Sequence, residues 1–157
     1  MGTDTRTRPA IRTWLAGIVV ALLVFPLSAF GSLGGDEATV QADRVHTNGT
    51  LKVARAQRYA VHEIRAPSGT LVREYVSPSG KVFGVAWNGP TMPDLRQVLG
   101  TYFDLYVEAA AKRGARGPVL VRQPGLVVQS SGHMRAFVGI AYVPEALPDD
   151  VAAEEIR

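Results

Sequence analysis

The tripeptide Pro-Ser-Gly occurs twice in this chain, at 67–69 and 78–80. Each copy lies between segments rich in β-branched and aromatic residues. Proline suits the first central position of a type I turn, and glycine takes the left-handed conformation that follows it. Each copy therefore predicts a three-residue hairpin loop with a bulge. Together they predict a three-stranded antiparallel meander over residues 59–88, the strongest constraint that the sequence places on the fold.

The loops also predict a strand register. If Ala66 and Thr70 close the first loop, His62 lies opposite Glu74. If the second loop closes in the same way, Glu74 lies opposite Gly84. The other predicted cross-strand pairs are Glu63 with Arg73, Tyr75 with Phe83, and Leu71 with Trp87.

Strand alternation then divides the side chains of the meander between two faces. One face is predicted to hold Tyr59, Val61, Leu71, Tyr75, Phe83, Val85 and Trp87. The other is predicted to hold Ala60, His62, Ile64, Val72, Glu74, Val76, Val82, Gly84 and Ala86. Because large rings contribute most buried area, we expect the aromatic face to be the core face.

A helix is predicted over residues 92–113, with Thr91 as its N-cap and Gly114 at its end. Its apolar residues recur at spacings of three and four, so Leu99, Tyr102 and Phe103 are expected to meet the aromatic face. Two or three further strands are predicted over 118–143, with a type II turn at Gln123-Pro124-Gly125. This order predicts a small α+β domain, residues 59–157, whose antiparallel sheet is packed by one long amphipathic helix.

The first 31 residues are typical of a secretory signal peptide. Three arginines lie in residues 1–12, an apolar run of 12 residues follows at 14–25, and small residues stand at Ala29 and Gly31. Cleavage is expected after Gly31, with cleavage after Ala29 as the alternative. The apolar run is short for a membrane span, so an inner-membrane anchor at 14–29 is the less favoured interpretation.

Export changes what the charge balance implies. The whole chain has 17 basic and 14 acidic residues; removing the three arginines and one aspartate of residues 1–31 leaves 14 and 13. No basic stripe remains that would indicate nucleic-acid binding. The chain has no cysteine, which excludes disulfides and thiol chemistry, and we expect a periplasmic or extracellular protein. Residues 32–58 are interpreted as an N-terminal extension, with a short helix over 37–45 after Asp36 and a linker carrying Lys52, Arg55 and Arg58.

Few residues indicate chemistry. The three histidines show no metal-ligand spacing, and neither a metal nor a cofactor is expected. The predicted His62–Glu74 pair would orient the imidazole and raise its pKa, and it is one candidate ligand site. Trp87 and Asn88, before the helix, form a second candidate. His133 and Arg135, beside Ser130 and Ser131, complete the set of candidate binding residues, none of which is assigned a catalytic role.

The resulting hypothesis is a non-enzymatic envelope module that binds another protein, a peptide or a surface polymer. The alternative is a hydrolase-like envelope enzyme that uses His133 or His62. A site joining His133, Ser131 and a carboxylate would favour the enzyme.

Four segments resemble a small family of secreted bacterial proteins known as domain of unknown function 2844. They are LGGD at 33–36, REYVSPSGKVFGVAWNGP at 73–90, PDLRQVLGTYF at 93–103 and SGHMRAFVGIAYVP at 131–144. The resemblance covers nearly all of the chain after residue 31. It implies an exported protein, and it brings no reaction, substrate or catalytic residue.

Overall fold

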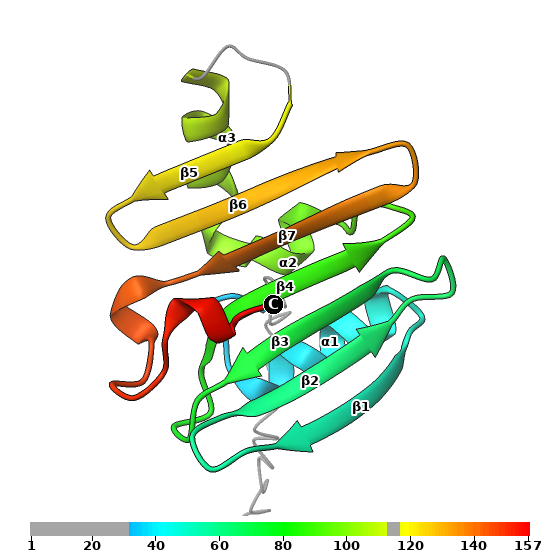
Figure 1. Ribbon diagram of the computed structural model, residues 1–157. Helices are drawn as coiled ribbons and strands as arrows, with labels where there is room; N and C mark the ends of the chain where they lie inside the picture. The colour runs from blue at the N-terminus through cyan, green and yellow to red at the C-terminus, as the bar shows by residue number, and fades with distance from the viewer. Residues whose placement is uncertain (1–31, 113–116) are drawn as a thin grey trace, which may run out of the picture.

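A computed structural model describes residues 32–112 and 117–157. Seven strands form one antiparallel sheet in the order β1-β2-β3-β4-β7-β6-β5, which confirms the predicted α+β class (Figure 1). The strands are β1 Thr50–Arg55, β2 Ala60–Arg65, β3 Leu71–Val76, β4 Val82–Gly89, β5 Val119–Gln123, β6 Leu126–His133 and β7 Ala136–Tyr142. The predicted signal segment and Gly114 lie outside the described residues.

Both Pro-Ser-Gly loops form as predicted. The Ala66 N–H donates to the Thr70 carbonyl over 2.9 Å, and the Ser77 N–H donates to the Lys81 carbonyl over 2.8 Å. Gly69 has a φ of 89° and is left-handed, as the turn requires. The first loop sets the predicted register between β2 and β3, with His62 opposite Glu74.

The predicted register of β4 is wrong from its second residue onward, so neither the Tyr75–Phe83 pair nor the Leu71–Trp87 pair forms. A bulge at Phe83 places Val82 opposite Val76 but Gly84 opposite Tyr75, so Glu74 faces Val85 instead of Gly84. The extra residue moves every later side chain of β4 to the other face. Val85 and Trp87 therefore join the face of Val72 and Val76, and Ala86 joins the face of Tyr75 and Phe83.

The long helix expected over 92–113 is divided into shorter segments. These are α2 Leu95–Leu99, the 3-10 helix Gly100–Tyr102 and α3 Phe103–Lys112. The division falls at Gly100, whose φ of 55° interrupts the α-helical path. The N-cap is Asp94 and not Thr91, because the Asp94 carboxylate accepts from the N–H groups of Arg96 and Gln97.

Residues 32–58 contribute to the same sheet. Helix α1, Glu37–His46, follows Asp36 as predicted and packs on the sheet beside β2. The linker interpretation of Lys52 and Arg55 is wrong, because both residues belong to edge strand β1, which pairs with β2 along its whole length. Exposed cations of this kind are common on edge strands, where they discourage pairing with other chains.

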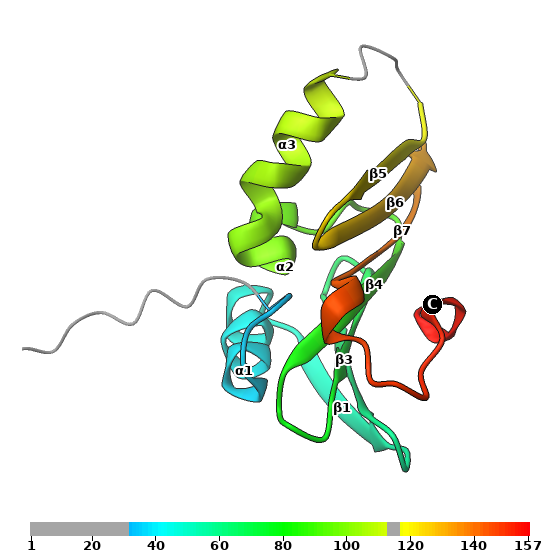
Figure 2. The same cartoon turned by 90° about the vertical axis from the view of Figure 1, so that its left-hand side faces the viewer.

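The two faces of the sheet have different covers (Figure 2). Helices α1, α2 and α3 lie on one face, the helical face, over a cluster that includes Ile64, Val72, Val85, Trp87 and Leu99. On the opposite face, here called the outer face, the segment after β7 packs on a second hydrophobic cluster. That cluster comprises Tyr75, Phe83, Ala86, Val151 and Ile156, with Tyr59, Val61, Ile140, Tyr142, Ala146 and Leu147 at its margin.

The expected contact between the helix and the aromatic face is therefore wrong. Leu99, Tyr102 and Phe103 pack with the Trp87 cluster, whereas the C-terminal segment covers Tyr75 and Phe83. Both faces contain large buried rings, so ring area alone did not identify the face on which the helices pack. No helix in the described parts of the chain is both long and apolar enough to span a membrane.

Candidate functional site

An open groove of about 620 Å³ crosses the outer face beyond the end of the C-terminal cover. Its lining comes from the β2–β3 hairpin, the end of β4 and the β6–β7 hairpin. Three arginines and no carboxylate line it. The lining residues are Arg65, Gly69, Leu71, Arg73, Asn88, Gly89, Pro90, Arg135, Ala136, Phe137 and Val138.

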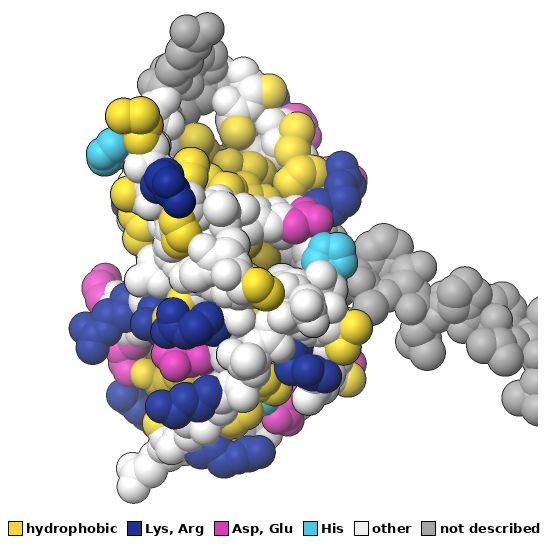
Figure 3. All heavy atoms as spheres, turned by 90° about the vertical axis from the view of Figure 1, so that its right-hand side faces the viewer, with side chains coloured by type: hydrophobic (Ala, Val, Ile, Leu, Met, Phe, Trp, Pro, Cys, Tyr) yellow, Lys and Arg dark blue, Asp and Glu magenta, His cyan; other side chains and the backbone are white. Residues whose placement is uncertain are grey.

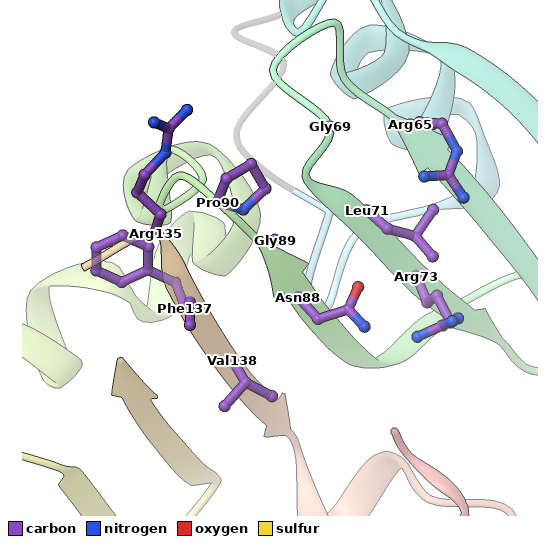
Figure 4. Close-up of a pocket in the computed structure, with 11 residues that line it drawn as sticks. Arg65, Gly69, Leu71, Arg73, Asn88, Gly89, Pro90, Arg135, Phe137 and Val138 are labelled. Atoms are coloured by element: carbon purple, nitrogen blue, oxygen red, sulfur yellow. The ribbon is translucent and has the colours of Figure 1, made fainter. Parts of the chain in front are cut away.

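The close-up shows how the groove is built (Figure 4). Arg65, Leu71 and Arg73 form one wall, and Phe137 and Val138 lie on the other side of Asn88. These positions follow from the sheet register, in which Asn88 lies opposite both Leu71 and Val138. The Arg135 guanidinium stands at the rim and points away from the floor.

The three arginines differ in the partners that they already have. The Arg73 Nε donates to the Glu63 Oε1 over 2.9 Å, and its Nη1 donates to the Arg157 carbonyl over 3.2 Å. Arg65 and Arg135 are exposed, and neither makes an ion pair with a described residue. The groove therefore offers two uncommitted guanidinium groups beside a third that is held in place.

The surface view shows the same end of the sheet from the side of the hairpin loops (Figure 3). Lys and Arg side chains gather over its lower half, with a few acidic side chains among them. Hydrophobic side chains dominate the upper part of this view. The lower half of this side therefore presents more basic than acidic side chains.

The structure places Asn88 and Arg135, two of the candidate residues from the sequence, together in this groove. Trp87, the neighbour of Asn88, faces the opposite way and is 1% exposed. A Cβ on Gly139 would lie only 2.2 Å from the Trp87 ring, so glycine is required where β7 crosses it. Trp87 is therefore a core residue, although its Nε1 has no hydrogen-bond partner in the described structure.

His62 and Glu74 lie opposite each other as predicted, but they do not form the expected ion pair. The His62 Nε2 lies 3.3 Å from the Glu37 Oε1 of α1. Burial lowers the pKa of His62; Glu37 acts in the raising direction and Arg55 in the lowering direction. The expected rise in the pKa of His62 is therefore wrong, because desolvation outweighs the neighbouring carboxylate.

Glu74 is fully buried and belongs to an acidic cluster beneath α1. The Ser32 Oγ lies 2.9 Å from the Glu74 Oε1 and 2.6 Å from the Asp43 Oδ2. Gln97 also donates to Asp43 from α2. Burial raises the pKa of Glu74 well above its ordinary value, and the nearby Asp43 carboxylate raises it further, while the Ser32 hydrogen bond acts in the opposite direction.

His133 ends β6 and is exposed, while Ser130 is buried on the helical face. The His133 side chain makes no hydrogen bond or ion pair with any described residue. A site that joins His133, Ser131 and a carboxylate, the arrangement that would favour the hydrolytic alternative, is therefore not formed in the described structure. Likewise, no three of its His, Asp or Glu side chains are placed to hold a metal ion.

Sequence reasoning missed several important residues. Alternation along β2 places Arg65 on the same face as Glu63, so its position beside Arg73 follows from the predicted register. Asp43 stands three residues after Val40 on the buried side of α1, an unusual position for a carboxylate. The sequence around Ser32 does not indicate its role, because its contacts with Asp43 and Glu74 depend on how distant segments pack.

The fold and groove define a small α+β domain with one face covered by helices and a basic groove on the other. The chain belongs to the family described as "Protein of unknown function (DUF2844)", whose model matches residues 29–156. Searches of curated proteins and of solved structures found no match.

Proposed function

We propose that this protein is exported to the cell envelope and binds an acidic peptide segment of an envelope partner in the outer groove. The observation that carries the proposal is a groove with three arginines, two of them uncommitted, and no carboxylate in its lining. Guanidinium groups match carboxylates in shape and charge, and the apolar side chains of Leu71 and Val138 beside them strengthen such contacts.

The composition of the groove favours a protein partner over a surface polymer. Its cations are all arginine, and Leu71 and Val138 supply apolar contact beside them. Arginine is enriched at protein interfaces, whereas lysine is depleted. Val138 is 51% exposed, so it retains apolar area that a partner would bury.

The export part of the proposal rests on the basic start, the apolar run at 14–25 and the small residues at Ala29 and Gly31. N-terminal sequencing of the protein recovered from cell envelopes tests it. A start at or near Ser32 is the expected result, whereas a chain that retains Met1 would contradict export by a cleaved signal.

Binding is tested with a fluorescent decapeptide of alternating aspartate and glycine, followed by anisotropy. Arg65→Ala combined with Arg135→Ala should weaken binding at least tenfold, because each charged hydrogen bond contributes about 1.5–3 kcal/mol. The control is Lys52→Ala with Arg122→Ala, which removes two exposed charges outside this groove. It should bind like the parent protein.

Two results would overturn this assignment. Equal weakening in both double variants would show that net charge, and not the groove, attracts the peptide. Binding of an acidic polysaccharide such as heparin, without binding of the peptide, would identify a polymer ligand instead.

A further inference from the structure

The acidic cluster on the helical face lacks a proton or a positive charge. The Ser32 Oγ contacts both Asp43 and Glu74, but a hydroxyl group has one hydrogen to donate. Only one of the two contacts is therefore a hydrogen bond from serine. The other is a close contact between two oxygen atoms, which needs a proton on the carboxyl group or a positive charge nearby.

The surroundings of Glu74 give independent evidence that a proton or a positive charge is missing. Its side chain is 0% exposed, and its Oε2 has no hydrogen-bond partner in the described structure. No described lysine or arginine makes an ion pair with Asp43 or Glu74. His62 lies opposite Glu74, but burial favours its neutral form. A buried carboxylate without a counter-charge is costly, and either a proton or a cation beside it removes that cost.

Ser32 is the first residue after the predicted leader. It is buried, and its side chain is already hydrogen-bonded within the cluster. Covalent geometry holds a serine nitrogen within about 3.7 Å of its own Oγ. Adding the contact distances of 2.6 and 2.9 Å, a free amine on Ser32 would lie within about 6.6 Å of both carboxylates.

We propose that the mature chain begins at Ser32 and that its α-ammonium group is the counter-ion of the buried Asp43–Glu74 pair. An envelope peptidase hydrolyses the Gly31–Ser32 bond with one water molecule. The leader departs with the Gly31 carboxylate, and the Ser32 amine takes up a proton. Leader removal thereby supplies the positive charge and the extra donors that the cluster lacks. This inference rests on the proposed export.

The experiment compares two forms of the domain that differ by one residue. One begins at Ser32, and the other retains Gly31, which moves the charged amine away from the cluster. Both contain every described helix and strand and both hydrophobic clusters. We expect the Ser32 form to melt several degrees higher at neutral pH. Its terminal amine should also react at least tenfold more slowly with an amine-specific acylating reagent, as located by peptide mapping.

The matched control places Asp43→Asn in both forms, which should remove most of the difference in melting temperature. Equal melting and equal amine reactivity of the two parent forms would overturn the proposal. A difference that Asp43→Asn leaves unchanged would show that the amine does not act through the pair, and would also overturn it.

The cleavage position separates this inference from the export proposal. An envelope protein that begins at another residue, such as Phe30 after cleavage at Ala29, would overturn the Ser32 assignment while export stands. A chain that retains Met1 would instead contradict export by a cleaved signal.

Discussion

The two faces of the sheet bury their aromatic residues in different ways. On the helical face, three helices lie over the hydrophobic cluster that contains Trp87, and the acidic cluster around Glu74 is buried beneath α1. On the outer face, the irregular segment after β7 covers Phe83 and Tyr75 and reaches Arg73 through the Arg157 carbonyl, but it leaves Arg65 and Arg135 exposed. One face is therefore completed as a core, whereas the other is only partly covered and keeps an open groove lined by arginines.

The largest expected effect concerns the partial cover of the outer face. Ile156 is 2% exposed, and its side chain fills the space above Gly84. Replacing Ile156 with alanine should lower the free energy of unfolding by roughly 2–5 kcal/mol, as for other buried isoleucines. Urea denaturation measures this change.

Val138→Ala is the matched control, because this outer-face residue is half exposed beside the groove. Its cost should stay within ~0.5 kcal/mol, as is usual for surface positions. Equal costs at the two positions would show that the outer face does not divide into a covered part and an open part.

A smaller effect on the free energy of unfolding is expected from the titration of His62 on the helical face. Burial lowers its pKa below the ordinary value of 6.5, so the unfolded chain binds the proton more readily. The stability that comes from keeping His62 neutral is fully present above pH 6.5. It is lost as the pH falls from 6.5 through the lower pKa that His62 has in the folded state. NMR titration of the ring should give a midpoint below 6.5.

Glu37→Gln should lower that midpoint further, because the Glu37 carboxylate favours the charged imidazole. A midpoint at or above 6.5 in the parent protein would contradict the lowered pKa and would show that burial does not control the titration of His62.

The smallest effect concerns Arg135 in the β6–β7 turn. Its φ of 68° is left-handed, a conformation that glycine adopts without strain. Arg135→Gly should therefore raise the free energy of unfolding by up to ~1 kcal/mol, measured by urea denaturation. The same change should weaken binding of the acidic peptide. A variant that loses stability, or that binds as well as the parent, would contradict the role given to this turn.

Local sequence determined the hairpins and much of the register. Both Pro-Ser-Gly loops form because proline and glycine restrict the backbone at the positions that the turn requires. The pairing of β2 with β3 follows directly from the first loop. Asn88 and Arg135 were selected as candidate residues from sequence, but their meeting in one groove required β4 and β7 to pair across 47 residues of chain.

Tertiary structure decided which face each later side chain occupies. The bulge at Phe83 reverses the faces of Val85 and Trp87, and no turn residue marks it, because the packing of Phe83 and Gly84 under the C-terminal segment involves distant residues. The contacts of Ser32 with Asp43 and Glu74 join segments that are 11 and 42 residues apart. Turns depend on the conformational limits of a few neighbouring residues, whereas burial depends on which distant surfaces exclude water together.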